Sequence, residues 1–128
     1  MVIMGLVFAL VGALVHVYIF VLESLLWTSP RARAVFGTSE EGALATRELA
    51  FNQGFYNLFL AVAVVVGTVL LGAGLTGAGA ALVYAGAGSM VLAGTVLAVS
   101  SPKKLRAALI QLAAPLVGMV LLTVGLAV

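Results

Sequence analysis

Residues 49–71, LAFNQGFYNLFLAVAVVVGTVLL, decide the fold because they form one long, mostly apolar segment without a charged side chain. The segment is longer than the roughly 20 residues that an α-helix needs to cross the hydrocarbon core of a bilayer. Its first half nevertheless carries Asn52, Gln53, Tyr56 and Asn57. Such side chains are costly in hydrocarbon unless they have hydrogen-bond partners. The segment therefore predicts a transmembrane helix whose polar half faces the interior of a helix bundle.

The composition of the whole chain agrees with this interpretation. Of its 128 residues, 64% are hydrophobic and 8% are charged, and the mean hydropathy is +1.30. Soluble domains carry about 25% charged residues. Three further apolar segments, about residues 2–27, 77–99 and 105–128, are long enough to span a bilayer. We therefore expect an all-α integral membrane protein, with residues 1–128 forming a single four-transmembrane-helix bundle.

The basic residues predict the orientation of this bundle. All six Lys and Arg lie in or beside the first and third connections, and the second connection has no charge. They are Arg31, Arg33, Arg47, Lys103, Lys104 and Arg106. The positive-inside rule places both basic loops in the cytoplasm and both ends of the chain outside. Because orientation accounts for the net charge of +2, we expect no nucleic-acid partner.

The first connection contains signals for the end of one helix and the start of the next. Pro30 is expected to stop helix one, and residues 31–37, RARAVFG, are expected to form a loop. Thr38 with Glu41 three residues later resembles a capping box that starts helix two. A helix running unbroken from there would exceed the bilayer thickness. Residues 39–48 should therefore lie in the cytoplasmic interface or form a separate short helix.

Helix three is dense in small residues at four-residue spacing, in the stretch GAGAALVYAGAGSMVLAG at residues 77–94. Small residues at this spacing let helix backbones approach closely in lipid. The pattern predicts tight packing inside the bundle, and it is also compatible with a seam between copies in a homo-oligomer.

Two ionisable side chains other than tyrosine lie deep in the apolar segments, and both belong to helix one. His16 and Glu23 differ by only about 20° around an ideal helix. Phe20 and Trp27 fall on the same stripe. A carboxyl group that faced lipid would be expensive, so this stripe is expected to face the bundle interior.

The polar residues of helix two are expected to meet this stripe, with Glu23 contacting Asn52 or Tyr56. One arc of helix two contains Glu48, Asn52, Gln53, Tyr56 and Asn57, and helix four adds Gln111 at a similar depth. Aromatic residues are expected to wall the resulting pocket: Phe20, Trp27, Phe55, Tyr56 and Phe59. A mostly apolar pocket with a few convergent polar groups is typical of a small-molecule site.

This constellation predicts a pocket in the cytoplasmic half that binds a lipophilic small molecule. Glu23 would act as general acid or base, His16 as its proton partner, and Tyr56 as the third catalytic group. The predicted substrate-binding residues are Asn52, Gln53, Asn57, Trp27, Phe20, Phe55, Phe59, Glu48 and Gln111. Isomerisation, epoxide opening or cyclisation would fit, because these reactions need proton transfer in a dry pocket and no cofactor.

Metal chemistry is not expected from this sequence. It contains no cysteine, and its single histidine is not part of an H-x-x-x-H or E-x-x-H spacing.

Two other functions remain open at the level of sequence. A small proton-coupled exporter would use Glu23 alternately for a proton and for a cationic substrate, with aromatic side chains around the cation. A structural or accessory membrane subunit without a ligand would use Glu23 and the helix-two amides only as contacts between helices.

Residues His16, Glu23 and Trp27, the VFG triplet at 35–37 and the string NQGFYNLFLA at 52–61 resemble a known family. It consists of small four-helix bacterial membrane proteins, domain-of-unknown-function family one-three-zero-four. The resemblance covers nearly the whole chain and implies a multi-pass location in the bacterial cytoplasmic (inner) membrane. It implies no established activity. Its signature positions correspond here to His16, Glu23, Trp27, Phe36, Asn52, Gln53, Tyr56 and Asn57.

Overall fold

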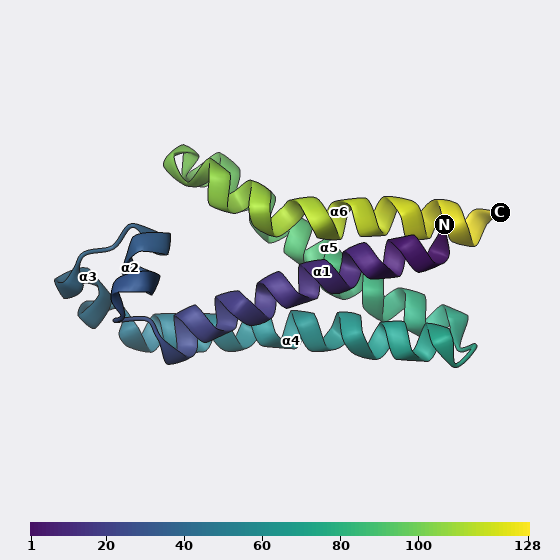
Figure 1. Cartoon of the computed structure of the whole chain (residues 1–128), viewed down its shortest axis with the longest axis horizontal. Helices are drawn as coiled ribbons and strands as arrows, with labels where there is room; N and C mark the ends of the chain where they lie inside the picture. Colours follow the sequence, from purple (N-terminus) through teal and green to yellow (C-terminus); the bar gives the residue numbers. More distant parts are fainter.

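The computed structural model describes residues 1–128 as helices joined by short connections (Figure 1). The elements are α1 (Val2–Phe20), a π-helical continuation η1 (Val21–Leu25), α2 (Pro30–Phe36), α3 (Glu40–Ala45), α4 (Arg47–Gly72), α5 (Thr76–Ser100), a 3₁₀ turn η2 (Pro102–Lys104) and α6 (Leu105–Ala127). Four helical segments are long and apolar enough to cross a membrane: Val2–Leu25, Arg47–Gly72, Thr76–Ser100 and Pro102–Ala127. The chain is therefore an all-helical, multi-pass membrane protein.

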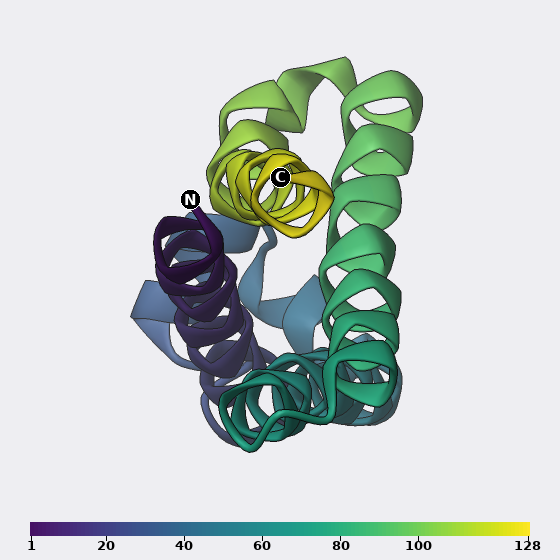
Figure 2. The ribbon, with the colours of Figure 1, turned by 90° about the vertical axis from the view of Figure 1, so that its right-hand side faces the viewer.

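The four long helices form a ring in which each helix packs against two neighbours (Figure 2). Helix α1 lies against α4 and α6, and α5 lies against the same two helices. Both ends of the chain lie at one end of the bundle, whereas α2, α3 and the α5–α6 connection lie at the other (Figure 1).

Close packing holds the half of the bundle that contains the chain ends. A Cβ atom at Gly79 of α5 would lie 2.6 Å from Leu71 N and 2.7 Å from the Gly67 carbonyl oxygen. Farther along α5, a Cβ at Gly86 would lie 2.9 Å from the Leu60 carbonyl oxygen. Gly79 and Gly86 of α5 thus pack against α4, whereas Gly94 packs against Leu112 of α6. Buried residues complete this core: Ala9, Ala13, Ala61, Val64, Val83, Ala87, Met90 and Leu122.

The opposite half of the bundle is splayed. Pro115 lies inside α6, where it donates no hydrogen bond to the carbonyl of Gln111 and its ring crowds that carbonyl. The first part of α6 slopes away from α1, and the second part runs along it (Figure 1). Contact resumes at Gly12, where a Cβ atom would lie 2.8 Å from Pro115 Cδ. The bend leaves space between the α1–α4 pair and the α5–α6 pair.

The first connection differs from the sequence expectation, because Pro30 starts a helix instead of stopping one. Helical structure in the first segment ends at Leu25, and residues 31–37 belong mainly to α2 instead of a loop. Ser29 caps α2 by accepting a hydrogen bond from Ala32 N at 3.2 Å. A proline fits the first helical position because its missing N–H has no partner there in any case.

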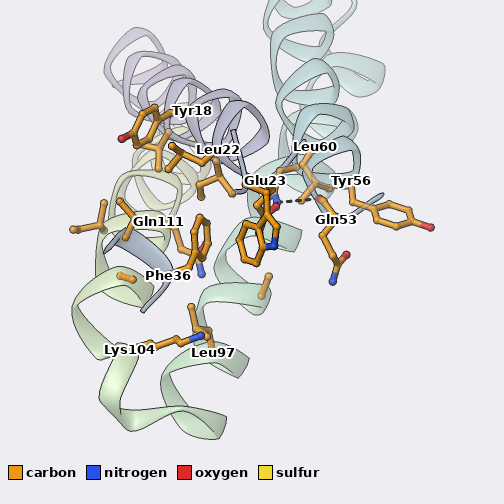
Figure 3. Close-up of a pocket in the computed structure, with 18 residues that line it drawn as sticks. Tyr18, Leu22, Glu23, Phe36, Gln53, Tyr56, Leu60, Leu97, Lys104 and Gln111 are labelled. Carbon is orange, nitrogen blue, oxygen red and sulfur yellow. Dashed lines mark hydrogen bonds between the residues drawn. The ribbon is translucent and has the colours of Figure 1, made fainter. Parts of the chain in front are cut away.

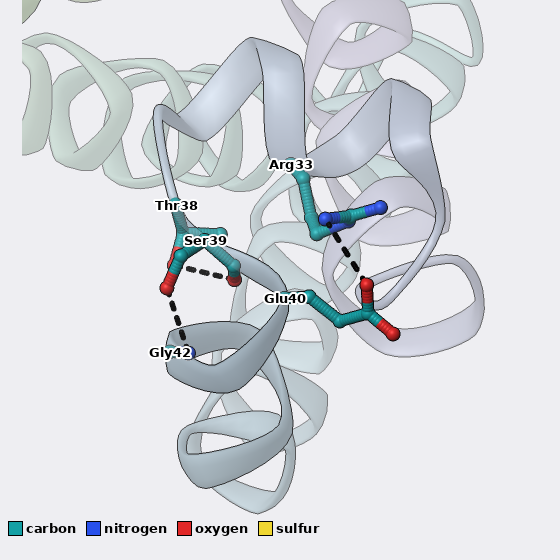
Figure 4. A network of polar contacts seen from close by, with 5 residues as sticks. All are labelled: Arg33, Thr38, Ser39, Glu40 and Gly42. Carbon is teal, nitrogen blue, oxygen red and sulfur yellow. Dashed lines mark hydrogen bonds and ion pairs between the residues drawn. The ribbon is translucent and has the colours of Figure 1, made fainter.

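Helix α3 is a separate short helix, and its cap is Ser39, not Thr38 (Figure 4). Ser39 Oγ accepts a hydrogen bond from Gly42 N at 3.0 Å, and Thr38 Oγ1 donates to the Ser39 carbonyl at 3.4 Å. The capping box expected from Thr38 and Glu41 is therefore wrong by one position. Arg33 Nη1 lies 3.8 Å from Glu40 Oε2 and connects α2 to α3.

The glycine contact between α4 and α5 predicts a difference between two identical substitutions. Gly79→Ala should lower the free energy of unfolding in detergent micelles by about 1–3 kcal/mol, because its methyl group forces two helix backbones apart. Gly77→Ala, on the same helix, should leave stability unchanged, since nothing lies within 4 Å of a Cβ there. Equal losses in both variants would contradict the contact.

Candidate functional site

A cavity of about 670 Å³ occupies the splayed half of the bundle (Figure 3). Its volume is within the range of roughly 300–1,000 Å³ that is typical of ligand pockets. All four membrane-spanning segments contribute to it, and α2 covers one side. The lining residues are Val15, Tyr18, Ile19, Leu22, Glu23, Trp27, Val35, Phe36, Gln53, Tyr56, Asn57, Leu60, Ala93, Leu97, Lys104, Ala107, Ile110 and Gln111.

A π-helical segment sets the direction of Glu23. In η1 the hydrogen bond from Leu26 N reaches back five residues to the Val21 carbonyl, at 3.0 Å. The wider turn rotates each residue by less than an α-helix does, so residues beyond Phe20 leave the face on which they would otherwise lie. Glu23 therefore lines the cavity, whereas His16 does not.

Glu23 contacts the expected helix, but at a different residue. Asn57 Nδ2 donates to Glu23 Oε2 at 2.8 Å and also approaches the carbonyl of Gln53, one turn earlier, at 3.1 Å. The sequence predicted Asn52 or Tyr56 as the partner of Glu23. The observed pairing leaves one carboxyl oxygen held by an amide and the group half-buried on the cavity wall.

The neighbouring residue explains this register between helices. Ser24 Oγ donates to the Phe51 carbonyl oxygen at 2.7 Å. A Cβ atom at Gly54 would lie 2.9 Å from Ser24 N, so the two backbones touch at that point. Asn57 is three residues after Gly54 and lies on the same face of α4. The backbone contact between Ser24 and Gly54 therefore brings the neighbouring Glu23 side chain within hydrogen-bond distance of Asn57.

Trp27 and Phe36 form the wall at the α2 end of the cavity. Their ring centroids are 5.0 Å apart with an interplanar angle of 55°. Trp27 Nε1 donates to Thr46 Oγ1 at 3.2 Å, and Thr46 Oγ1 donates to the Gly42 carbonyl at 2.7 Å. These contacts join the turn after helix one to the junction between α3 and α4.

A second, more polar cavity of about 420 Å³ adjoins the first. We call this second cavity the vestibule. The residues that line the vestibule but not the first cavity are Gly37, Thr38, Thr46, Leu49 and Ala50. Five residues line both spaces: Glu23, Trp27, Phe36, Gln53 and Lys104. The site thus has an apolar inner part and a polar outer part, and the Glu23 side chain borders both.

Six of the predicted site residues lie together in the cavity lining: Glu23, Trp27, Gln53, Tyr56, Asn57 and Gln111. His16 does not join them. It is 1% exposed, and its Nδ1 lies 2.9 Å from the Gly12 carbonyl oxygen within its own helix. The role of His16 as proton partner of Glu23, which about two helical turns of separation would in any case make indirect, stays a prediction.

The other predicted residues lie outside the cavity. Phe20, Phe55 and Phe59 belong to an aromatic cluster between α1 and α4, with Phe20 and Phe55 centroids 5.1 Å apart. Glu48 and Asn52 are exposed on α4, where Asn52 Nδ2 donates to the Glu48 carbonyl at 3.3 Å. The 180° arc predicted for helix two was too wide, since only part of it faces the cavity.

Sequence reasoning missed Tyr18 and Lys104 as lining residues. Tyr18 OH accepts a hydrogen bond from Arg31 Nε at 2.8 Å, and the Arg31 guanidinium carbon lies 5.7 Å from the ring centroid. Lys104 was considered only as an orientation signal. Lys104 ends η2 at the start of the fourth membrane-spanning segment, level with Trp27 at the end of the first. This position is the signal that could have identified it.

The lining supports hydrogen bonding and proton transfer more than metal binding. Glu23 is its single acidic residue, and no histidine belongs to it. The same lining contains the amides of Gln53, Asn57 and Gln111 and the side chain of Lys104, and of these Asn57 contacts the carboxyl group. This set offers donors to a polar ligand and one group that can exchange a proton.

Replacing Asn57 tests the contact that orients Glu23. Asn57→Leu should lower the free energy of unfolding in detergent by about 0.6–1.7 kcal/mol, because it removes a hydrogen bond between helices inside the membrane. Asn52→Leu is the matched control and should have a smaller effect, since its amide bonds only within α4. If the two losses were equal, Glu23 would not depend on Asn57.

Comparison with known proteins identifies one family that this chain matches. No curated protein and no solved structure matches the chain. One family model, described as "Protein of unknown function (DUF1304)", matches residues 10–123. The match covers most of the chain, from α1 to α6, and includes the whole cavity lining. The chain therefore belongs to the DUF1304 family.

Proposed function

We propose that the cavity binds a lipophilic small molecule and that Glu23 acts on it as general acid or base, without a cofactor. The observation that carries this proposal is the Glu23 carboxyl group on the wall of a mostly apolar cavity, held by the Asn57 amide at 2.8 Å. Hydrophobic residues account for 13 of the 18 in the lining. A ligand that fits such a lining is largely apolar, with a few polar atoms near the carboxyl group.

The proposed location is the cytoplasmic half of a bacterial cytoplasmic membrane. The two connections that carry all six Lys and Arg lie at the cavity end of the bundle (Figure 1). The positive-inside rule then places this end in the cytoplasm and both chain ends on the outer side.

The substrate is proposed to enter from the bilayer. Tyr18 and Tyr56 both line the cavity, yet they are 42% and 65% exposed on the outer surface of the bundle. These exposed lining residues on α1 and α4 support entry between helices from the surrounding lipid. A molecule dissolved in the membrane could reach Glu23 without first entering water.

In the proposed reaction Glu23 transfers a proton to or from the bound molecule. Isomerisation, epoxide opening and cyclisation are reaction types that include such a proton transfer and need no cofactor, with the other bond changes taking place within the substrate itself. The Asn57 amide orients the carboxyl group, and Gln53 and Gln111 are proposed to hold polar atoms of the substrate, whereas the Tyr56 ring points away from the other lining side chains (Figure 3). His16 has no part in this revised proposal.

The packed half of the bundle supports a pocket over an export pathway. An exporter must open Glu23 to both sides of the membrane in turn. Between the cavity and the chain ends lie Ala13, Val64 and Met90, each at most 3% exposed. An accessory subunit without a ligand remains the alternative to be tested, because it needs Glu23 only as a contact.

Glu23→Gln separates the catalytic role from the structural one. Parent and variant are reconstituted in bilayers of total bacterial lipid extract in D₂O, and deuterium uptake into the lipids is followed by mass spectrometry. The variant should incorporate deuterium at least about 10²-fold more slowly, because a carboxamide cannot act as a general acid or base toward the substrate. It should remain folded to within roughly 1 kcal/mol, since the amide keeps the shape and most hydrogen bonding. Equal uptake by parent and variant would make Glu23 a packing residue.

His16→Gln is the control for this experiment. It should lower stability in detergent, because His16 is a buried polar side chain bonded to the Gly12 carbonyl. It should leave deuterium uptake unchanged, since His16 does not line the cavity. A folded His16→Gln protein with uptake as low as that of Glu23→Gln would contradict the separation of the two residues.

A further inference from the structure

Lys104 is the cationic side chain that borders both the cavity and the vestibule. No other Lys or Arg lines either space. The structure contains a single ion pair, between Arg33 and Glu40, so no carboxylate lies within ion-pair distance of the Lys104 ammonium group. Orientation in the membrane requires basic residues in this connection, but it does not require one of them to line the cavity. Lys103 and Arg106, its neighbours in the sequence, do not line it.

The placement of Lys104 divides the site into regions of different chemistry. In Figure 3 the Lys104 side chain extends from η2, just before α6, toward Leu97 at one end of the cavity. Glu23 lies on the wall formed by the first membrane-spanning segment and α4. Apolar side chains such as Leu22, Leu60 and Ile110 line the inner part. Gln53 adds an amide beside the vestibule.

We propose that the ligand is a single-chain amphiphile with an anionic head group, a carboxylate or a phosphate, which Lys104 binds at the junction of cavity and vestibule. The proposal rests on the lipophilic ligand of the proposed function and specifies its class. The hydrocarbon chain occupies the apolar inner part, and the carbon atoms next to the head group lie against Glu23. An unpaired ammonium group at the polar end of an apolar cavity is complementary to such a molecule.

The chain contains its own probe for this binding. Trp27 is the only tryptophan, and it lines both the cavity and the vestibule. Bromine atoms on a bound chain quench tryptophan fluorescence at short range. The full chain in phosphatidylcholine nanodiscs is titrated with dibromostearic acid, the corresponding alcohol and the corresponding amine, which share one chain and differ in head group. The saturable quenching that unbrominated stearic acid displaces measures site binding.

The parent protein is expected to bind the acid about tenfold more tightly than the alcohol, the difference that one hydrogen bond to a charged group makes. The amine should bind no more tightly than the alcohol. Lys104→Gln should reduce the preference for the acid to less than about twofold and leave the alcohol unaffected. Lys103→Gln removes the same charge from the same loop, and it should keep the preference. A brominated lysophosphatidic acid tells whether a phosphate head group is bound more tightly than a carboxylate.

Two results would overturn the assignment of an anionic head group. Equal affinity of the parent for acid and alcohol would do so, although saturable binding of both would still support a lipophilic ligand. Equal loss of preference in Lys103→Gln and Lys104→Gln would assign the effect to the surface charge of the loop. If no probe gave displaceable quenching, the lipophilic-ligand proposal would fail together with this one.

Discussion

The hydrogen bond from Asn57 to Glu23 joins the first and second membrane-spanning segments, and the candidate site depends on it. Inside hydrocarbon a carboxyl group needs a partner from the protein, because neither water nor lipid tails provide one. The contact is possible because Ser24 and Gly54 bring the two backbones together one step away. Glu23 itself lies in the π-helical segment Val21–Leu25. Local backbone geometry thus decides which polar groups meet.

Small residues bring helix backbones together in both halves of the bundle, whereas the bulky or bent residues lie in the half near α2. Toward the chain ends, Gly67 and Gly79 let α4 and α5 touch along their backbones. Toward α2, the proline in α6 and the rings of Trp27 and Phe36 keep the helices apart. Van der Waals packing drives helix association in lipid, so a tightly packed half can hold the fold while the other half stays open. This division lets a chain of 128 residues contain a cavity of about 670 Å³.

Site residues were predicted correctly where the prediction depended only on the residue and its own segment, and less well where it depended on contacts with other helices. Glu23, Gln53 and Asn57 were recognisable because polar side chains in an apolar segment need a partner, whatever the fold. His16 and Glu23 were expected on one face because ideal α-helical rotation was assumed through Val21–Leu25, which is π-helical, and only Glu23 lines the cavity. Phe55 failed for a related reason, since aromatic residues serve equally in a cavity wall and in contacts between helices.

By itself, the sequence determined that this protein is helical and crosses a membrane several times, and it located a polar cluster near one end of the apolar segments. Those properties depend on composition and on segment length, which need no knowledge of neighbours. Only the tertiary structure decided that Asn57 binds Glu23, that His16 is buried outside the cavity lining and that Lys104 borders the same cavity as Glu23. These facts depend on the register between helices and on one π-helical turn. Close backbone contacts between helices, such as that of Gly54 with Ser24, set this register. The hydrophobic periodicity of the sequence does not predict such contacts.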